Sequence, residues 1–279
     1  MRSIARKSMV IRSLIAVDAM DLTLAQSVLG AASGIFVGFS LGLVGGGGSI
    51  LAVPLIVYVV GVLDPHVAIG TTAVAVAVNA GINFSIHARK RMVKWRCASL
   101  FAVAGAMGAF LGSTLGKAVD GQKLLFLFAL LMIVIGILML RGRKGEGNPG
   151  VHLNRSNAPK LAGAGFLAGG LSGFFGIGGG FLIVPGLMIA TGMPIINAVA
   201  SSLLPVAAFG TTTAANYALS GWVDWSLAAI FIAGGIAGGI GGTKLSHHLA
   251  GRRGMLNVAF SCLIFLVAGY MLYRSRGAL

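Results

Sequence analysis

Two glycine-rich clusters are the part of this chain best suited to bind a ligand. They occupy residues 45–48 and 176–180, and a proline, Pro54 or Pro185, follows each of them within a few residues. Consecutive glycines interrupt a helix and free backbone N–H groups, and free N–H groups at the start of a helix bind anions. Neither cluster is followed by the Gly-Lys-Ser/Thr sequence of a nucleotide-binding loop. The clusters therefore predict an anion site built from backbone amides, with a ligand-free helix turn as the alternative.

Neutral polar side chains follow each cluster and could complete a shell around an anion. Thr72, Asn79 and Asn83 are spaced by seven and four residues, which places them on one face of a helix. Thr212 and Asn216 form a matching pair. Hydrogen bonding between helices is the alternative role for these side chains. The complete set of candidate substrate-binding residues is Gly45, Gly47, Gly48, Ser49, Thr71, Thr72, Asn79, Asn83, Gly176, Gly178, Gly179, Gly180, Ser201, Ser202, Thr212 and Asn216.

Catalytic and metal-binding residues are not expected. No Asp, Glu, Lys or Arg lies inside an apolar stretch, apart from residues near the ends such as Lys244. The stretches therefore lack the acids that an intramembrane enzyme or a carboxylate proton relay would use. His247 and His248 have no carboxylate or cysteine neighbour at metal-ligand spacing, and Cys97 and Cys262 lie in separate stretches. We expect neither a metal site nor a cofactor.

The composition places these residues in lipid. Of 279 residues, 57% are hydrophobic and only 10% are charged, and the mean hydropathy is +0.93. A soluble domain has about 25% charged residues, so a soluble protein is excluded. The formal net charge is +15, but the basic residues form short clusters between uncharged stretches. We interpret these clusters as topology signals that face an anionic lipid leaflet, and we do not expect nucleic acid as a partner.

Long uncharged stretches predict the helices that position the glycines. They run over residues 22–63, 67–86, 97–116, 124–140, 161–223, 226–243 and 255–273. A membrane-spanning helix needs about 20 residues, so the first and fifth stretches are too long for one helix. The first should break at residues 45–48, and the fifth should divide into three pieces, at 178–180 and at 192–194. The expected fold is an all-α polytopic membrane protein with about eight to ten hydrophobic segments.

The same pattern occurs twice in the chain. Residues 34–54 align with 165–185 at an offset of 131, and later the offset becomes 130, which pairs Trp95 with Trp225. This duplication predicts a tail at 1–23, a first transmembrane repeat at 24–140, a cytoplasmic linker at 141–160 and a second repeat at 161–274. Glycines that recur every four residues predict closely packed helix faces. They are Gly34, Gly38 and Gly42, then Gly108, Gly112 and Gly116, then Gly165, Gly169 and Gly173, and finally Gly234, Gly238 and Gly242.

The loop charges predict that the two repeats are inverted in the membrane. Residues 89–96 and the linker 141–160 each hold five basic residues and should be cytoplasmic, whereas 222–225 holds one acid, Asp224, and no base. Residues 91–95 and 221–225 occupy matching positions in the two repeats, so matching loops should face opposite sides. Each repeat would then consist of a glycine-interrupted helix hairpin and three transmembrane helices. This arrangement would place both termini outside, whereas the basic residues near each end favour the cytoplasmic side.

The doubled pattern resembles the TauE/SafE sulfite exporter family. The two copies read GFSLGLVGGGGSILAVP at 38–54 and GGLSGFFGIGGGFLIVP at 169–185, and the loop GWVDW at 221–225 is also similar. The first repeat departs from the pattern, with RMVKW at 91–95 and Ser49 in place of Gly180, so the two half-sites should not be equivalent.

The resemblance covers residues 24–274 and implies a multi-pass transporter of the bacterial inner membrane. The resemblance further implies a transporter of the 4-toluene sulfonate uptake permease type, which would move small sulfur-containing anions such as sulfite or organosulfonates, often outward. A proton or a sodium ion is a candidate coupling ion. An anion channel, or a facilitator for another small organic anion, is the alternative.

Overall fold

The computed structural model describes residues 22–89, 93–141, 153–155, 157–248 and 253–275, and every regular element within them is helical. The first half contains α2 (Leu24–Val44), η1 (Gly45–Leu51), α3 (Ala52–Leu55), η2 (Ile56–Val60), α4 (Pro65–Arg89), α5 (Trp95–Ala118) and α6 (Gly121–Arg141). The second half contains α7 (Ala158–Phe175), α8 (Gly180–Thr191), α9 (Ile195–Ala218), α10 (Trp225–His248) and α11 (Arg253–Ser275). Most of the predicted tail 1–23 and much of the linker 141–160 lie outside the described residues.

Six of these helices, α2, α4, α5, α6, α9 and α10, are long and apolar enough to cross a bilayer. Shorter apolar segments lie at Gly48–Val60, Gly180–Thr191 and Ser261–Ser275. Large apolar side chains also point outward, among them Leu167 at 68% exposure and Leu266 at 71%. Such exposure is expected where lipid is the solvent. The predicted class of all-α polytopic membrane protein is confirmed.

Polar side chains cap the N-termini of several helices. Asp64, Asp120 and Asp224 each precede the first residue of a helix, α4, α6 or α10, and each carboxylate accepts a hydrogen bond from an amide of the first turn. At α2, Thr23 and Gln26 exchange hydrogen bonds with each other's amides as a capping box. Half of the six acidic residues of the chain are thus used as helix caps.

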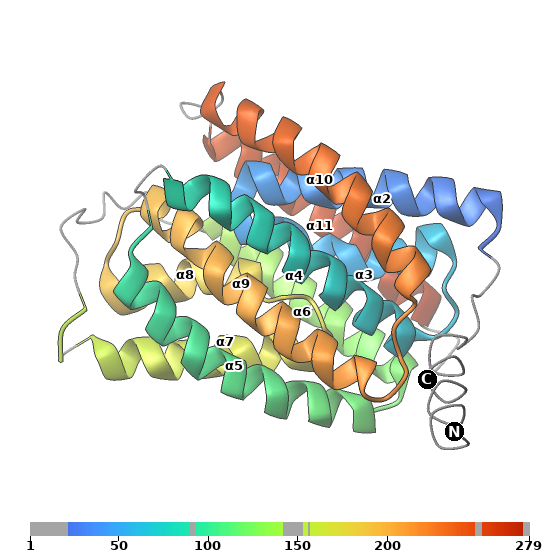
Figure 1. Ribbon diagram of the computed structural model, residues 1–279, viewed down its shortest axis with the longest axis horizontal. Helices are drawn as coiled ribbons and strands as arrows, with labels where there is room; N and C mark the ends of the chain where they lie inside the picture. Colours follow the sequence, from blue (N-terminus) through green and yellow to red (C-terminus); the bar gives the residue numbers. More distant parts are fainter. Residues whose placement is uncertain (1–21, 90–92, 142–152, 156, 249–252, 276–279) are drawn as a thin grey trace, which may run out of the picture.

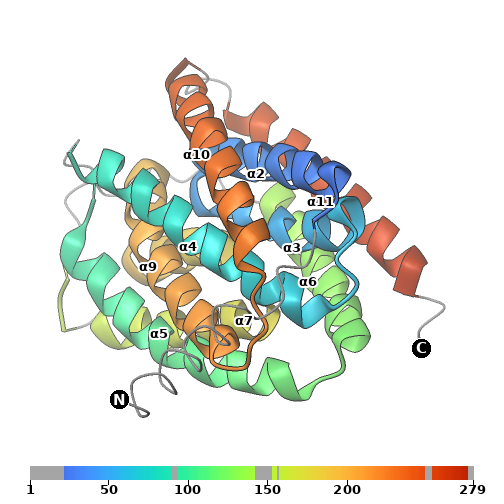
Figure 2. The same cartoon turned by 45° about the vertical axis from the view of Figure 1, so that its right-hand side comes forward.

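Two helix pairs join the two halves. In each pair a helix of one half packs against a helix of the other, α2 against α10 and α7 against α5 (Figures 1 and 2). Both pairs run parallel, since Gly34, Gly38 and Gly42 meet successive turns of α10 in the same order. A side chain at any of these three glycines would collide with the backbone of α10. The glycines of α5 meet the backbone of α7 in the same way. The predicted glycine ladders therefore lie at helix contacts, where they let backbones approach closely.

Helices α4 and α9 occupy matching positions in the two halves and lie side by side (Figures 1 and 2). Gly70 near the start of α4 contacts Tyr217 near the end of α9, and Ala77 further along α4 contacts Gly210 further back on α9. The two helices therefore run antiparallel. Matching helices of the two halves thus point in opposite directions at the centre of the fold.

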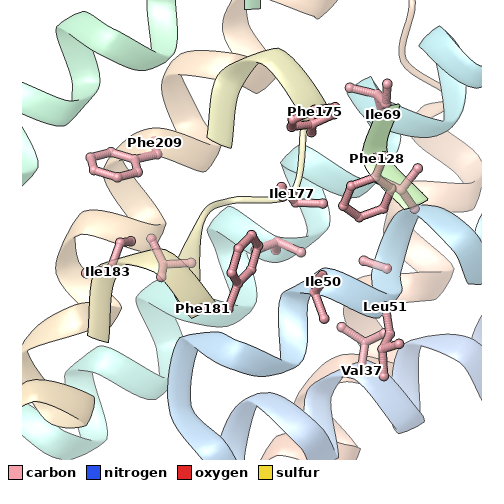
Figure 3. Packing of buried hydrophobic residues seen from close by; sticks show 14 of the residues in the cluster. Val37, Ile50, Leu51, Ile69, Phe128, Phe175, Ile177, Phe181, Ile183 and Phe209 are labelled. Atoms are coloured by element: carbon pink, nitrogen blue, oxygen red, sulfur yellow. The ribbon is translucent and has the colours of Figure 1, made fainter. Parts of the chain in front are cut away.

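The core surrounds the two glycine-rich segments (Figure 3). Ile50 and Leu51 of η1 and Ile177 and Phe181 of the second segment are buried there, together with Phe128 of α6. The element η1 also contacts α8. The two segments that the sequence marks as helix breaks, distant along the chain, therefore meet inside the protein.

Candidate functional site

The second glycine cluster forms a tight break between α7 and α8. Helix α7 ends in a left-handed residue, Gly176 (φ +68°), and the amide of Ile177 donates to the carbonyl of Ser172 at 3.2 Å. Gly178 (φ +67°) and Gly179 (φ +65°) then turn the chain into α8. A side chain strains the backbone in this region by about 1–2 kcal/mol. Three left-handed positions in four residues explain why this segment is built from glycine.

At this break, the start of α8 presents amides that have no hydrogen-bond partner among the described residues. The amides of Leu182 and Ile183 donate to the carbonyl of Gly179, at 2.9 Å and 3.1 Å. Those of Gly180 and Phe181 come earlier in the first turn, where a helix offers no internal acceptor. This end of a helix also carries a partial positive charge of about half a unit. The arrangement is chemically suited to hold an oxyanion, as the sequence predicts.

Apolar side chains surround the second break (Figure 3). Ile69 of α4 packs against Gly176, and Phe209 of α9 lies 3.4 Å from the point where Gly179 would carry a Cβ atom. At Gly178 the corresponding distances are 2.7 Å to Val76 of α4 and 3.5 Å to Val206 of α9. These walls exclude water, which strengthens hydrogen bonds from the amides to a charged ligand.

One polar side chain at the break is absent from the sequence-based candidates. Ser172 of α7 is fully buried beside Gly179, and its hydroxyl has no hydrogen-bond partner among the described residues. Its matching position in the first repeat is Leu41. Comparing the two copies for a polar residue present in only one of them would have found it.

The first break has a different backbone. The 3₁₀ helix η1 continues directly from α2, and after α3 the chain forms the π-helix η2, which ends at left-handed Gly61 (φ +85°). Gly48 packs against the backbone of α2, and Ser49 is fully buried. The two halves therefore contribute unlike segments to the centre.

Four of the candidate hydroxyls are already engaged within the protein. Thr71 accepts from the backbone amide of Asp224, and Ser201 accepts from that of Lys94, both at 2.9 Å. These two contacts occupy matching positions and tie each half to the other. The hydroxyls of Thr72 and Ser202 donate to carbonyls of their own helices. Substrate binding by these hydroxyls stays a prediction, and the site proposed below does not include them.

Asn79 and Asn83 face α10, where they lie against Gly235 and Gly239. The side chain of Asn83 donates to the carbonyl of Asn79 at 2.9 Å and accepts from Thr243 at 3.5 Å. Both polar atoms of the Asn79 side chain are buried without a hydrogen-bond partner among the described residues. The predicted common face of these two asparagines is confirmed, and it is directed at the helix of the other half.

Thr212 and Asn216 of α9 already have hydrogen-bond partners within the protein. Thr212 donates to a carbonyl of its own helix at 2.9 Å. Asn216 donates to Ser113 of α5 at 2.7 Å and accepts from the ammonium group of Lys117, also at 2.7 Å. Asn216 therefore links α9 to α5, which is the alternative role of hydrogen bonding between helices, and substrate binding by Thr212 and Asn216 stays a prediction.

A pocket of about 550 Å³ opens at the end of the molecule where α4 begins and α5 ends. Asp64, His66, Lys117 and Trp222 are among its lining residues. His66 lies one helical turn before Ile69, which packs against Gly176. The pocket is therefore an opening on the surface that lies one turn of α4 away from the residue that packs against Gly176.

Comparison with known proteins is consistent with this architecture. The chain is 51% identical over 259 residues to a Probable membrane transporter protein of Xylella fastidiosa, which covers 92% of this chain and 99% of that protein. It is 26% identical over 239 residues to the Probable membrane transporter protein YunE of Bacillus subtilis, and the match covers 77% of this chain and 87% of that protein. It is 28% identical over 187 residues to the Probable membrane transporter protein MJ0441 of Methanocaldococcus jannaschii, covering 63% and 68%. No solved structure matches the chain significantly.

The family comparison covers both repeats. Residues 30–271 match the model described as Sulfite exporter TauE/SafE. That range contains all the described helices except the first residues of α2 and the last residues of α11. This multi-pass membrane protein therefore belongs to the TauE/SafE family of membrane transporters.

Proposed function

We propose that the protein is a secondary transporter that exports small sulfur-containing anions, such as sulfite or organosulfonates, and that the anion binds where the two breaks meet. One observation carries the proposal. Gly178, in a left-handed turn at the start of a helix, lies between Val76 and Val206, which occupy matching positions in the two halves. The break thus reaches the centre of the pseudosymmetric structure, where a transporter built from repeats places its substrate.

The direction of the helices supports an inverted relation between the repeats. When two repeats are related by a two-fold axis in the membrane plane, matching helices that meet at this axis run antiparallel. Helices α4 and α9 run antiparallel. The matched contacts of Thr71 with Asp224 and of Ser201 with Lys94 lie near opposite ends of this helix pair. Rocking of one half against the other would then open the central site to each side in turn. The surface pocket beside His66 would be the outer opening.

The proposed location is the bacterial inner membrane, with a proton or sodium gradient as a candidate driving force. Relatives from Xylella fastidiosa and Bacillus subtilis support a bacterial setting. An anion channel is the alternative, since the same breaks would suit a pore. No observation on the described residues favours it over a transporter.

Flux measurements on purified protein in proteoliposomes test the proposal. We expect saturable uptake of radiolabelled sulfite that accelerates when the vesicles are preloaded with unlabelled sulfite, because a transporter exchanges substrate through one site. Imposed proton and sodium gradients identify the coupling ion. Flux that follows the membrane potential without saturating would support the channel. No flux of sulfite or methanesulfonate above that of empty vesicles would contradict both.

Cysteine labelling in cells tests the inverted topology. Arg96 and Ser226 are both exposed, lie in the first turn of α5 and α10, and occupy matching positions in the repeats. In a background without Cys97 and Cys262, we expect Arg96→Cys to react only from the cytoplasm and Ser226→Cys only from outside. Reaction of both from the same side would contradict the inverted arrangement.

A further inference from the structure

The hydroxyl of Ser172 is an unusual feature of the second break. Hydroxyls inside helices commonly donate to a carbonyl three or four residues earlier, as Ser113 and Thr191 do in this protein. The hydroxyl of Ser172 instead lies 2.8 Å from the point where Gly179 would carry a Cβ atom, and it has no partner among the described residues. Buried polar groups are rarely left unpaired. The hydroxyl of Ser172 is therefore available to a ligand, and its position beside Gly179 distinguishes it from the other buried hydroxyls without a partner among the described residues.

The hydroxyl is placed beside the free amides at the start of α8. Gly179 is the residue that precedes the first turn of this twelve-residue helix, so Ser172 lies against the same helix end as the amides of Gly180 and Phe181. In the first repeat, Leu41 occupies the position of Ser172. The first break thus has no hydroxyl at the position that matches Ser172. In this structure the turn at residues 178–179 covers the hydroxyl.

All the donors at this break are uncharged. The side chains nearest to Gly176, Gly178 and Gly179 are Ile69, Val76, Val206, Phe209 and Ser172. The basic side chains that the structure describes lie in loops or near helix ends: Lys94, Arg96, Lys117, Lys123, Arg155, Lys160, Lys244 and Arg274. Lys117 already donates to Asn216 and Ser220. The positive charge available to the ligand is therefore about the half unit of the α8 terminus.

The net charge of the ligand follows from this environment. The energy needed to move an ion from water into an apolar site rises with the square of its charge, so a dianion requires about four times as much as a monoanion of the same size. A few neutral donors and half a positive charge can offset the desolvation energy of a monoanion far better than that of a dianion. Building on the proposed function, we infer that the protein transports sulfur oxyanions as monoanions, hydrogensulfite or an organosulfonate, and that Ser172 is a further substrate-binding residue.

Methanesulfonate and sulfate provide the test, because they have similar tetrahedral shapes and differ in charge. Each is used to inhibit uptake of radiolabelled sulfite by the full chain in proteoliposomes. We expect methanesulfonate to inhibit at a concentration at least tenfold lower than sulfate. Sulfate inhibition that equals or exceeds that of methanesulfonate would overturn the assignment of a monoanion.

Two serine variants test the residue. We expect Ser172→Ala to raise the concentration of methanesulfonate needed for half-inhibition roughly tenfold, as loss of one hydrogen bond to a charged group predicts. Ser261→Ala is the matched control, because Ser261 of α11 is also fully buried with a hydroxyl that lacks a partner among the described residues. It should leave inhibition unchanged. A normal response of Ser172→Ala, at normal folded yield, would overturn the role of Ser172. Absence of sulfite uptake by the wild-type protein would instead contradict the proposed function.

Discussion

Replacing Gly178 with valine is expected to abolish transport of sulfite and methanesulfonate while the protein still inserts into the membrane. Gly178 has a φ of +67°, which a β-branched residue adopts only with strain. A Cβ atom there would also lie 2.7 Å from Val76 and 3.5 Å from Val206. The new side chain would therefore occupy the centre of the proposed site and push on both central helices. Uptake by proteoliposomes, normalised to the amount of inserted protein, measures the effect.

Gly192→Val is the matched control for backbone strain. Gly192 follows the last residue of α8 and has a similar φ of +73°, but a Cβ atom there would meet nothing within 4 Å. Both variants carry comparable strain, and only Gly178→Val adds atoms against Val76 and Val206. We expect Gly192→Val to retain transport. Wild-type uptake by Gly178→Val would show that the second break is a simple turn without a role in binding.

The second large effect is expected at a glycine ladder. Gly238 of α10 packs on α2, and a Cβ atom there would collide with the carbonyl of Ile35 and lie 2.8 Å from the amide of Phe39. The obstacles are backbone atoms, which cannot rotate away as a side chain can. Overpacking typically costs about 1–3 kcal/mol, and Gly238→Leu should exceed this because two helices must separate. We expect a loss of most folded protein in size-exclusion chromatography.

Gly81→Leu separates this effect from the general cost of adding a large side chain to a helix. Gly81 lies within α4, and a Cβ atom there would meet nothing within 4 Å. We expect this variant to keep nearly normal yield and a normal thermal midpoint in detergent. Equal stability of Gly238→Leu and Gly81→Leu would contradict the close packing of α2 on α10.

Local sequence features predicted the helices and their interruptions well. The long stretch at 161–223 divides into α7, α8 and α9 at the glycine and proline positions expected, because these residues alter backbone conformation wherever they occur. The glycine ladders also lie at helix contacts as predicted. The first break was harder to foresee. Four consecutive glycines permit many conformations, so their sequence does not select the 3₁₀ and π segments seen in η1 and η2.

The roles of polar side chains depend on tertiary contacts and could not be predicted in the same way. Asn216 and Asn79 are both amides within uncharged stretches, yet one pairs with Ser113 and Lys117 while the other has no partner among the described residues. Ser172 was overlooked because helical spacing does not relate it to the other candidates. Its place beside the start of α8 depends on the turn at 178–179, which packs against α7 in the folded protein. Sequence therefore located the break, and the structure selected the side chains beside it.

Anomalous X-ray diffraction from crystals grown with selenite, a heavier analogue of sulfite, would test the central claim most directly. Diffraction at the selenium absorption edge locates the bound anion without assumptions about its contacts. We predict one strong selenium peak beside the first-turn amides of α8, within hydrogen-bonding distance of Ser172 and the amides of Gly180 or Phe181. A selenium peak confined to the surface pocket around Lys117, with none at either break, would contradict the claim that the anion binds where the two breaks meet.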